Sequence, residues 1–190
     1  MPKNSASTLV LIRHGQTDWN IDRRFQGQVD IPLNATGREQ AALAATNLSE
    51  FALMRQQTQP DFAWDGIITS PLSRAHETGQ IIADALELPL LEQVDGLKER
   101  FFGDAEGEIV DRENWLHFET LFAGVEPETE FIDRGIEALN AITGKHAGKN
   151  IVVVSHGMWI SKVMGHLTGE EHPIPENASV LEFNLALLEQ

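Results

Sequence analysis

Residues 151–157 read IVVVSHG, in which a continuous apolar run is followed by a serine, a histidine and a glycine. Such a run is typical of a strand buried on both faces, as in a parallel sheet covered by helices. Residues 8–15 read TLVLIRHG and repeat the pattern. If these two strands are neighbours in one sheet, Arg13, His14 and His156 lie together at the edge where the strands end.

The rest of the chain alternates predicted strands with predicted helices. Further strands are expected at residues 66–69, 88–94 and 180–183, and residues 100–111 are expected to form a loop. Helices are expected at 36–52, 70–86, 128–143 and 157–168, with Thr36 and Ser70 as the N-caps of the first two and Glu39 completing a capping box. This alternation predicts an α/β fold, a three-layer sandwich with a mostly parallel sheet and helices on both faces.

Length and composition limit the class of protein. The chain has 190 residues, 42% of them hydrophobic, so a single domain over residues 1–190 is expected. The polar start and the short apolar run after it differ from a secretory signal or a membrane span, and a cytoplasmic protein is expected. Without cysteine, covalent chemistry needs histidine, serine, threonine, lysine or a carboxylate.

The net charge is −15, from 14 basic and 29 acidic side chains. At long range this charge repels nucleic acid and anionic membrane surfaces, so neither is expected as a partner. A small phosphorylated substrate stays compatible with it, because within about 10 Å the local charges decide the potential. The pocket for such a substrate must then be locally cationic.

Three polar clusters follow predicted strands, namely Arg13 with His14, the stretch from Ser70 to Arg74, and His156. Ligands of such sheets bind beyond the carboxyl ends of the strands, so the three clusters can converge on one pocket. Two imidazoles and two guanidiniums supply the fixed donors that a transferring phosphoryl group requires. A neutral imidazole among them can attack phosphorus if an acceptor, such as a backbone carbonyl, binds the proton on its other ring nitrogen.

Several short segments form an ordered set that spans nearly the whole chain: RHGQTDWN at 13–20, RFQG at 24–27, LNATG at 33–37, SPLSRA at 70–75, LKE at 97–99, GDAEG at 103–107 and VSHG at 154–157. Together they resemble the histidine phosphatase superfamily, which includes cofactor-dependent phosphoglycerate mutases and fructose-2,6-bisphosphatases. The resemblance implies a phosphoglycerate mutase-like fold.

The resemblance also implies roles for individual residues. It implies that His14 becomes a phosphohistidine and that Glu99 is the proton donor for the leaving oxygen, which requires a raised pKa. The phosphoryl oxygens and the substrate would be bound by Arg13, Asn20, Gln26, Gly27, Arg74 and His156. The function predicted is hydrolysis of a small-molecule phosphate monoester, without a metal or another cofactor.

Other functions compete with this prediction. A phosphoglycerate mutase is the nearest alternative, although mutases of this family typically carry a longer insertion after the acid than the span from Glu99 to His156 provides. A non-catalytic regulatory protein of the same fold and a metal-dependent hydrolase are further alternatives, and no HExxH spacing supports a metal. The oligomeric state stays open, with a homodimer as one alternative.

Some residues are expected to lie outside the chemistry. His76 is expected to be structural or exposed, and four more histidines have no obvious partners: His117, His146, His166 and His172. The segment with Trp115 and Phe118 is expected to be an amphipathic helix rather than a lid. Arg134 follows a stretch, 127–130, that departs from the family pattern. The region 101–130 is expected to build the pocket wall.

Overall fold

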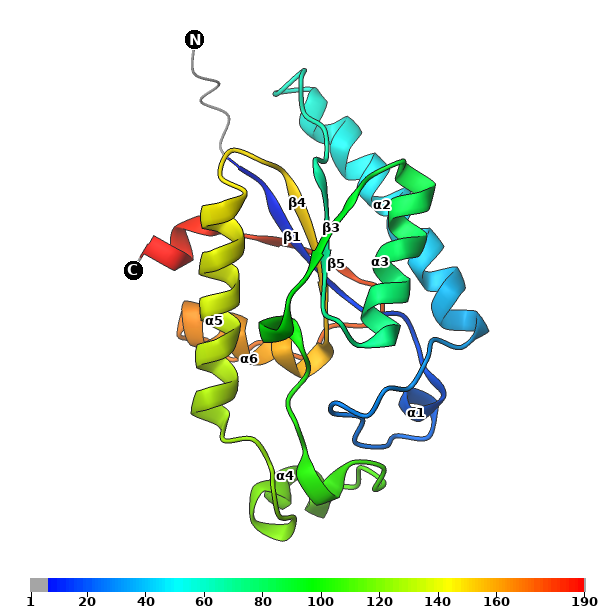
Figure 1. The fold of residues 1–190 in the computed structure, drawn as a ribbon, viewed down its shortest axis with the longest axis vertical. Helices are drawn as coiled ribbons and strands as arrows, with labels where there is room; N and C mark the ends of the chain where they lie inside the picture. The colour runs from blue at the N-terminus through cyan, green and yellow to red at the C-terminus, as the bar shows by residue number, and fades with distance from the viewer. Residues whose placement is uncertain (1–6, 190) are drawn as a thin grey trace.

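The computed structural model describes residues 7–189 and contains a five-stranded sheet in the order β3-β2-β4-β1-β5 (Figure 1). The strands are β1 (Leu9–Arg13), β2 (Gly66–Thr69), β3 (Leu90–Gln93), β4 (Ile151–Ser155) and β5 (Val180–Phe183). All neighbours are parallel except β5, which pairs with β1 in the antiparallel sense. The predicted mostly parallel sheet is confirmed. The polar start at residues 1–6 lies outside the described residues.

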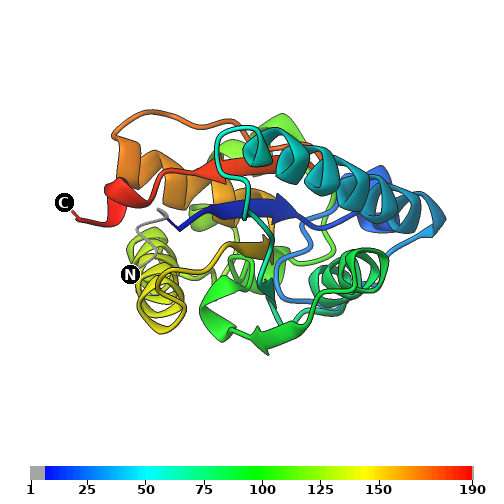
Figure 2. The same ribbon diagram turned by 90° about the horizontal axis from the view of Figure 1, so that it is seen from above.

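Helices cover both faces of this sheet. They are α1 (Asp18–Ile21), α2 (Ala35–Gln56), α3 (Ser73–Leu86), α4 (Arg112–Leu121), α5 (Glu128–Lys145) and α6 (Gly157–Thr168). Figure 2 shows α2 and α3 on one side of the sheet and α5 and α6 on the other. The short helices α1 and α4 lie beyond the carboxyl ends of β1 and β4 (Figure 1). This arrangement is the predicted three-layer α/β sandwich.

The central strands are buried on both faces, which explains their continuous apolar sequences. Successive side chains of a strand point to opposite faces. In β1, Leu9 and Leu11 pack into a core with α5 and α6, whereas Val10 and Ile12 pack into a second core with α2 and α3. Full burial of each such side chain contributes about 1.5–3 kcal/mol, so both layers depend on this strand.

The register of the central strands brings the two histidines together. β1 pairs with β4 such that Arg13 lies opposite Ser155, and His14 and His156 follow immediately. The neighbouring β2 also pairs with β4 and leads into Ser70. The adjacency on which the predicted pocket depended is therefore present.

Two predicted helix starts are wrong. Helix α2 is capped by Asn34, whose side chain accepts from the Gly37 N–H over 2.8 Å, rather than by Thr36. Helix α3 begins at Ser73 without a side-chain cap, and the Ser70 hydroxyl contacts His156 and accepts from the Leu72 N–H. Helix α1 was not predicted, while α4 confirms the expected amphipathic helix, with Phe118 buried.

Candidate active site

A cavity of about 120 Å³, called here the inner cavity, opens at the carboxyl ends of the central strands. The predicted site residues come together at this cavity. Seven of the eight predicted site residues line it, namely Arg13, His14, Asn20, Gln26, Gly27, Arg74 and Glu99. The aromatic part of its wall comes from Phe25, Phe102 and Trp115, so residues 101–130 contribute to the wall as expected.

His14 is held in one orientation. Its Nδ1 lies 2.7 Å from the carbonyl oxygen of Gly15, which can only accept, so Nδ1 carries the proton and Nε2 has the lone pair. The ring is 3% exposed. Burial lowers the pKa of His14 well below its ordinary value, and the charges of Arg74 and Arg13 lower it further. The imidazole is therefore neutral, with Nε2 in the inner cavity.

Close packing of the backbone fixes the loop after His14. A side chain on Gly15 would place its Cβ 2.2 Å from the carbonyl oxygen of Gly37, so only glycine fits. The Gly15 N–H donates to the hydroxyl of Thr78 over 3.0 Å. The carbonyl of His14 accepts from the side-chain amide of Asn177 over 2.9 Å. These contacts leave the His14 ring little freedom to turn.

Arg74 is fully buried against the same nitrogen. Its Nε donates to His14 Nε2 over 3.3 Å, and its two other nitrogens donate to the carbonyls of Gly27 and Val29 over 2.6 and 2.9 Å. Burial lowers the pKa of Arg74 to about 10, although the charge of Glu99 opposes the shift. The group is still a cation at neutral pH. Gly27 has φ +50°, a conformation that favours glycine.

Arg13 approaches the site from the end of β1. Its Nη1 donates to the carbonyl of Pro175 over 2.7 Å, and its buried Nε has no partner among the described residues. Burial lowers the pKa of Arg13, and the charge of Glu99 opposes this shift as well. A half-buried guanidinium with a buried, unused N–H is suited to bind an anion.

His156 lies directly beside His14 but is not part of the cavity wall. The two ring centroids are 5.2 Å apart, with 61° between the ring planes. His156 Nε2 lies 2.8 Å from the Ser70 hydroxyl, while its buried Nδ1 has no partner in the described part of the chain. Burial, followed by the charge of Arg74, lowers the pKa of His156 well below its ordinary value. This imidazole is also neutral.

Glu99 is buried, and its carboxyl group lies against the first residues of helix α6. Its Oε1 accepts from the N–H groups of Arg100 and Trp159, and its Oε2 accepts from that of Met158, each over 3.0 Å. Burial raises the pKa of Glu99, which the hydrogen bonds from Arg100 and Met158 and the charges of Arg74 and Arg13 oppose. Burial is the largest of these causes, so the carboxyl group keeps its proton to higher pH than an exposed one.

Asn20 and Gln26 complete the cavity wall. Asn20 is fixed through its Oδ1, which accepts from the Thr17 N–H over 3.0 Å. The buried side-chain oxygen of Gln26 has no partner among residues 7–189. Both side-chain amides therefore stand at the site with polar atoms that a ligand can use.

Several residues to which the sequence assigned no role in the site hold it together. Glu106 accepts from the N–H groups of Gln28 and Val29 over 2.6 and 3.1 Å and thereby fixes the loop whose carbonyls bind Arg74. Asn177 contacts His14, Thr78 contacts Gly15, and Ser70 contacts His156, as described above. The partners of Glu106 and Asn177 are distant in sequence, so no local pattern could have indicated these contacts.

Other predicted positions lie away from the chemistry. His76 contacts Thr69 and Gln93 and is not in the cavity wall, as expected for a structural residue. Arg134 binds the carbonyls of Gly96, Lys98 and Glu99 and pairs with Glu126, so it supports the acid loop from behind.

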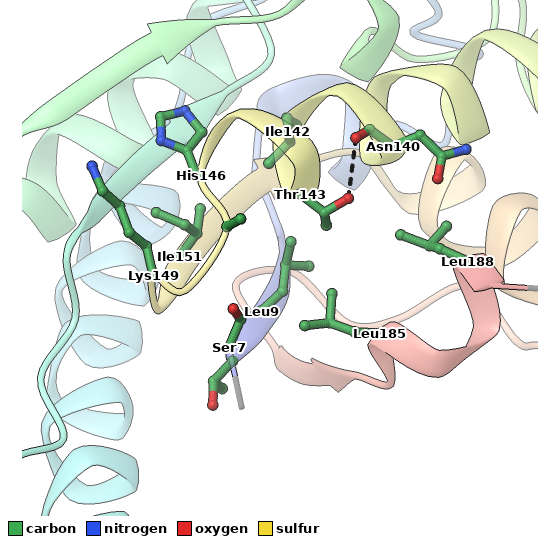
Figure 3. A pocket seen from close by; sticks show the side chains of 12 residues that line it. Ser7, Leu9, Asn140, Ile142, Thr143, His146, Lys149, Ile151, Leu185 and Leu188 are labelled. Atoms are coloured by element: carbon green, nitrogen blue, oxygen red, sulfur yellow. Dashed lines mark hydrogen bonds between the residues drawn. The ribbon is translucent and has the colours of Figure 1, made fainter. Parts of the chain in front are cut away.

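Two of the four remaining histidines do have partners, which corrects the expectation. His146 Nε2 lies 2.9 Å from Glu92, and His172 Nε2 lies 3.1 Å from the hydroxyl of Thr168. His146 also borders a separate cavity of about 270 Å³ at the amino ends of β1 and β4, opposite Leu185 and Leu188 (Figure 3). That cavity shares no residue with the inner cavity.

Within residues 7–189 no three histidine or acidic side chains gather as a metal site would require. None of the helices described is both long enough and apolar enough to cross a membrane.

The site is suited to transfer of a phosphoryl group, because cations and a neutral imidazole converge on one small cavity. Comparison with known proteins gives the family. Residues 9–188 match the sequence model of the histidine phosphatase superfamily (branch 1), and the chain belongs to this superfamily.

Three relatives illustrate the range of the family. "Uncharacterized phosphatase PhoE" of Bacillus subtilis (strain 168) is 35% identical over 181 residues, 95% of this chain and 86% of that protein. The metal-independent phosphoserine phosphatase of Arabidopsis thaliana is 31% identical over 168 residues, 82% of this chain and 66% of that protein. The crystal structure of phosphoglycerate mutase from Bacillus anthracis str. Sterne superposes with a TM-score of 0.77 at 27% identity, covering 93% of this chain and 86% of that one.

Proposed function

We propose that this enzyme hydrolyses the phosphate monoester of a small molecule through a phosphohistidine intermediate on His14, with Glu99 as the proton donor. The observation that carries the proposal is the orientation of the His14 ring. Its Nδ1 is bound to the Gly15 carbonyl, so Nε2 offers a lone pair at the point where the Arg74 Nε lies 3.3 Å away. A nucleophile and a cation therefore face the same small volume.

In the first half-reaction, the Nε–H of Arg74 exchanges its hydrogen bond to His14 for one to a phosphoryl oxygen, and the released lone pair on Nε2 of His14 attacks phosphorus. A P–N bond forms as the P–O bond to the leaving group breaks, and Glu99 gives its proton to the departing oxygen. Arg13 and Arg74 stabilise the negative charge on the phosphoryl oxygens. The amides of Asn20 and Gln26 and the backbone at Gly27 hold the bound ester.

His156 contributes a third donor in this proposal. If the Ser70 hydroxyl donates to Nε2, the proton of the neutral ring is on Nδ1, the nitrogen that has no partner among the described residues. That N–H then binds a phosphoryl oxygen beside the His14 ring.

In the second half-reaction, water attacks the phosphohistidine. The ionised Glu99 takes a proton from this water, the P–N bond breaks, and inorganic phosphate leaves. Glu99 is thereby protonated again and His14 is again neutral, so the cycle closes without a further reactant. A metal ion is not needed for any of these steps.

The substrate class follows from charge and cavity size. The net charge of −15 argues against nucleic acid or a membrane surface, whereas the buried cations of the inner cavity suit one small phosphate ester. We place this reaction in the cytoplasm, with no cofactor.

The test is a screen of small phosphate esters, beginning with p-nitrophenyl phosphate, on the wild-type protein and on His14→Ala. Wild-type protein should release phosphate and the variant should be inactive. Brief exposure to a labelled ester should leave an acid-labile, base-stable label on the wild-type protein only. Wild-type turnover by His14→Ala would end the proposal, and full activity with a chelator present is expected.

Phosphoglycerate mutase activity is the second candidate, favoured by the structural likeness to the Bacillus anthracis enzyme. A mutase must keep water from the phosphoenzyme, and the short segment between Glu99 and His156 offers less cover. Incubation with 3-phosphoglycerate separates the two functions. Phosphate release faster than formation of 2-phosphoglycerate supports hydrolysis, and the reverse supports the mutase. A regulatory protein would form no phosphohistidine with any donor.

A further inference from the structure

A second, more open cleft of about 480 Å³ adjoins the inner cavity and is called here the outer cleft. The two volumes share four wall residues, Asn20, Arg24, Val110 and Trp115. The remaining wall of the outer cleft consists of Trp19, Arg23, Asp111 and Arg112. A leaving group that extends from a phosphate in the inner cavity can therefore reach the outer cleft directly.

The outer cleft is rich in guanidinium groups. Arg23, Arg24 and Arg112 line it, and with Arg13 and Arg74 of the inner cavity they make five of the nine arginines in a chain of net charge −15. The one acidic wall residue, Asp111, uses its carboxylate as the N-cap of α4, accepting from the Asn114 N–H over 2.8 Å. Arg24 also pairs with Asp22, with 3.5 Å between Nε and Oδ2, and donates to the Gly107 carbonyl over 2.7 Å, so Arg23 and Arg112 are the arginines of the cleft without an ion pair in the described part of the chain. Positive charge is thus concentrated in this cleft of an otherwise acidic protein.

Two of these arginines occupy positions that cost stability. Arg23 has φ +54°, an uncommon conformation for a residue other than glycine, and is held there as its carbonyl accepts from the Val110 N–H over 2.6 Å. Arg112 is the first residue of α4, where a cation opposes the positive end of the helix dipole. The positive φ of Arg23 belongs to the turn that ends α1, where the Arg24 N–H donates to the Trp19 carbonyl over 2.9 Å. An anion bound beside Arg112 would offset the unfavourable position of that cation.

The alternative direction for a leaving group is much less cationic. A side cleft of about 750 Å³ also meets the inner cavity, at Trp115, Met158 and Ile174. Its wall carries Glu128, Glu170 and Glu171, and the amino group of its one lysine, Lys162, lies 2.8 Å from Glu128. An anionic leaving group is therefore directed to the outer cleft.

Trp115 separates the two directions. It lines the inner cavity, the outer cleft and the side cleft, and its ring stacks on that of Phe25 with 6.1 Å between the centroids. The face of a fixed aromatic ring can support the organic part of a ligand between two anionic ends.

We propose that the substrate carries a second anionic group, a carboxylate or another phosphate, which Arg23, Arg24 and Arg112 bind in the outer cleft while the reacting phosphate lies in the inner cavity. This inference rests on the proposed function, because it takes the inner cavity as the phosphate site. It defines the substrate class as a small organic phosphate with an anionic leaving group.

Binding to full-length His14→Ala protein, measured by calorimetry, tests the inference without turnover. The probes are 3-carboxyphenyl phosphate, its neutral match 3-carbamoylphenyl phosphate, and benzene-1,3-diyl bisphosphate. The carboxylate should bind at least about tenfold more tightly than the carboxamide at low salt, since it gains charge-assisted hydrogen bonds, and the ratio should fall with added salt. Comparison of the bisphosphate with the carboxylate shows whether the outer cleft prefers a second phosphate or a carboxylate.

Three variants, each with one further substitution in the His14→Ala protein, show which residues cause the preference for the carboxylate. Arg112→Ala should reduce the ratio to less than about threefold, and Arg23→Gly, which suits the positive φ, should do the same. Lys162→Ala in the side cleft is the matched control and should keep the tenfold ratio. Equal binding of carboxylate and carboxamide overturns the inference, as does a ratio that responds to Lys162 and not to Arg112.

Turnover of phenyl phosphate by the wild-type protein distinguishes a failure of the outer-cleft inference from a failure of the proposed function. If phenyl phosphate is hydrolysed in a His14-dependent manner but the carboxylate brings no preference, only the inference about the outer cleft fails. If no ester binds and none is hydrolysed, the proposed function fails and the inference with it.

Discussion

The Nε of Arg74 donates to the Nε2 of His14 over 3.3 Å, so a buried cation faces the lone pair of a neutral imidazole. Both groups reach this position through main-chain contacts. Gly15 orients the imidazole, and the carbonyls of Gly27 and Val29 orient the guanidinium. The arrangement needs a planar fork of donors, because one arginine contacts three acceptors in different directions.

Replacement of Arg74 by lysine should show this requirement. The amino group of Arg74→Lys cannot reach both carbonyls and the imidazole, so kcat/KM for p-nitrophenyl phosphate should fall roughly 100-fold to 1,000-fold. Steady-state kinetics measure the loss, and thermal unfolding checks that the variant folds. Arg38→Lys, at an exposed arginine paired with Glu77, is the control and should retain activity. A loss of less than threefold in Arg74→Lys would show that the charge alone is enough.

Activity should depend on pH through two groups whose pKa values move in opposite directions. Burial lowers the pKa of His14 from 6.5 and raises that of Glu99 from 4.5. Protonation of His14 removes the nucleophile on the acid side, and ionisation of Glu99 removes the proton donor on the alkaline side. A plot of kcat/KM against pH for an alkyl phosphate should therefore be bell-shaped. A profile without an alkaline limb would contradict the role of Glu99.

The proton donor should matter most for a poor leaving group. In Glu99→Gln the departing oxygen receives no proton, so hydrolysis of an alkyl phosphate should fall roughly 100-fold or more. Nitrophenolate leaves without a proton, and the loss for p-nitrophenyl phosphate should be at least tenfold smaller by the same reasoning. The comparison of the two substrates in one variant provides its own control. Equal losses would point to a binding role for Glu99.

The sequence predicts the central strands well, for a physical reason. Strands buried on both faces must be apolar at every position, so β1, β2 and β4 are continuous runs that no turn or exposed helix would contain. The ends of these strands then indicate the site, since parallel strands bring their carboxyl ends to one edge. His14 and His156 were predicted in this way.

Details that depend on distant partners were not predictable. Thr36 and Glu39 fit a capping box, yet Asn34 is the N-cap, because the helix begins two residues earlier. Ser70 looked like a cap and instead contacts His156, which is 86 residues away. The four-residue helix α1 is too short to show a period of 3.6 residues. Tertiary contacts decide each of these cases.

Glu106 provides a test of such a distant contact. Its carboxylate accepts from the backbone N–H groups of Gln28, Val29 and Phe102, so it holds the loop that positions Arg74. Glu106→Gln should lower kcat by about tenfold and the free energy of unfolding by about 1.5–3 kcal/mol, the range for hydrogen bonds to a charged group. Kinetics and urea unfolding measure the two effects. Glu108→Gln, at an exposed neighbour, should change neither, and a normal kcat in Glu106→Gln would exclude a positioning role.

The buried neutral histidines should make the protein sensitive to acid. His14 and His156 have lowered pKa values in the folded state, whereas in the unfolded chain each binds a proton below about pH 6.5. The unfolded state therefore binds more protons as the pH falls through 6.5, and the free energy of unfolding should decrease by up to about 1.4 kcal/mol per pH unit for each histidine. Glu99, with a raised pKa, has the opposite sign, because its folded form keeps a proton that the unfolded form loses above its ordinary value of 4.5.

Urea unfolding of Glu99→Gln protein, which lacks the opposing carboxyl group, at about pH 7.5 and about pH 5.5 measures the histidine contribution. This variant should lose about 1–3 kcal/mol between the two conditions, and Glu99→Gln with His14→Asn should lose roughly half as much. Glu99→Gln with His117→Asn, at an exposed position on α4, should lose as much as Glu99→Gln alone. Stability that is independent of pH over this range would mean that the two imidazoles titrate normally in the folded protein. In that case the imidazole of His14 would be a cation in mildly acidic solution, and attack through its Nε2 would fail there.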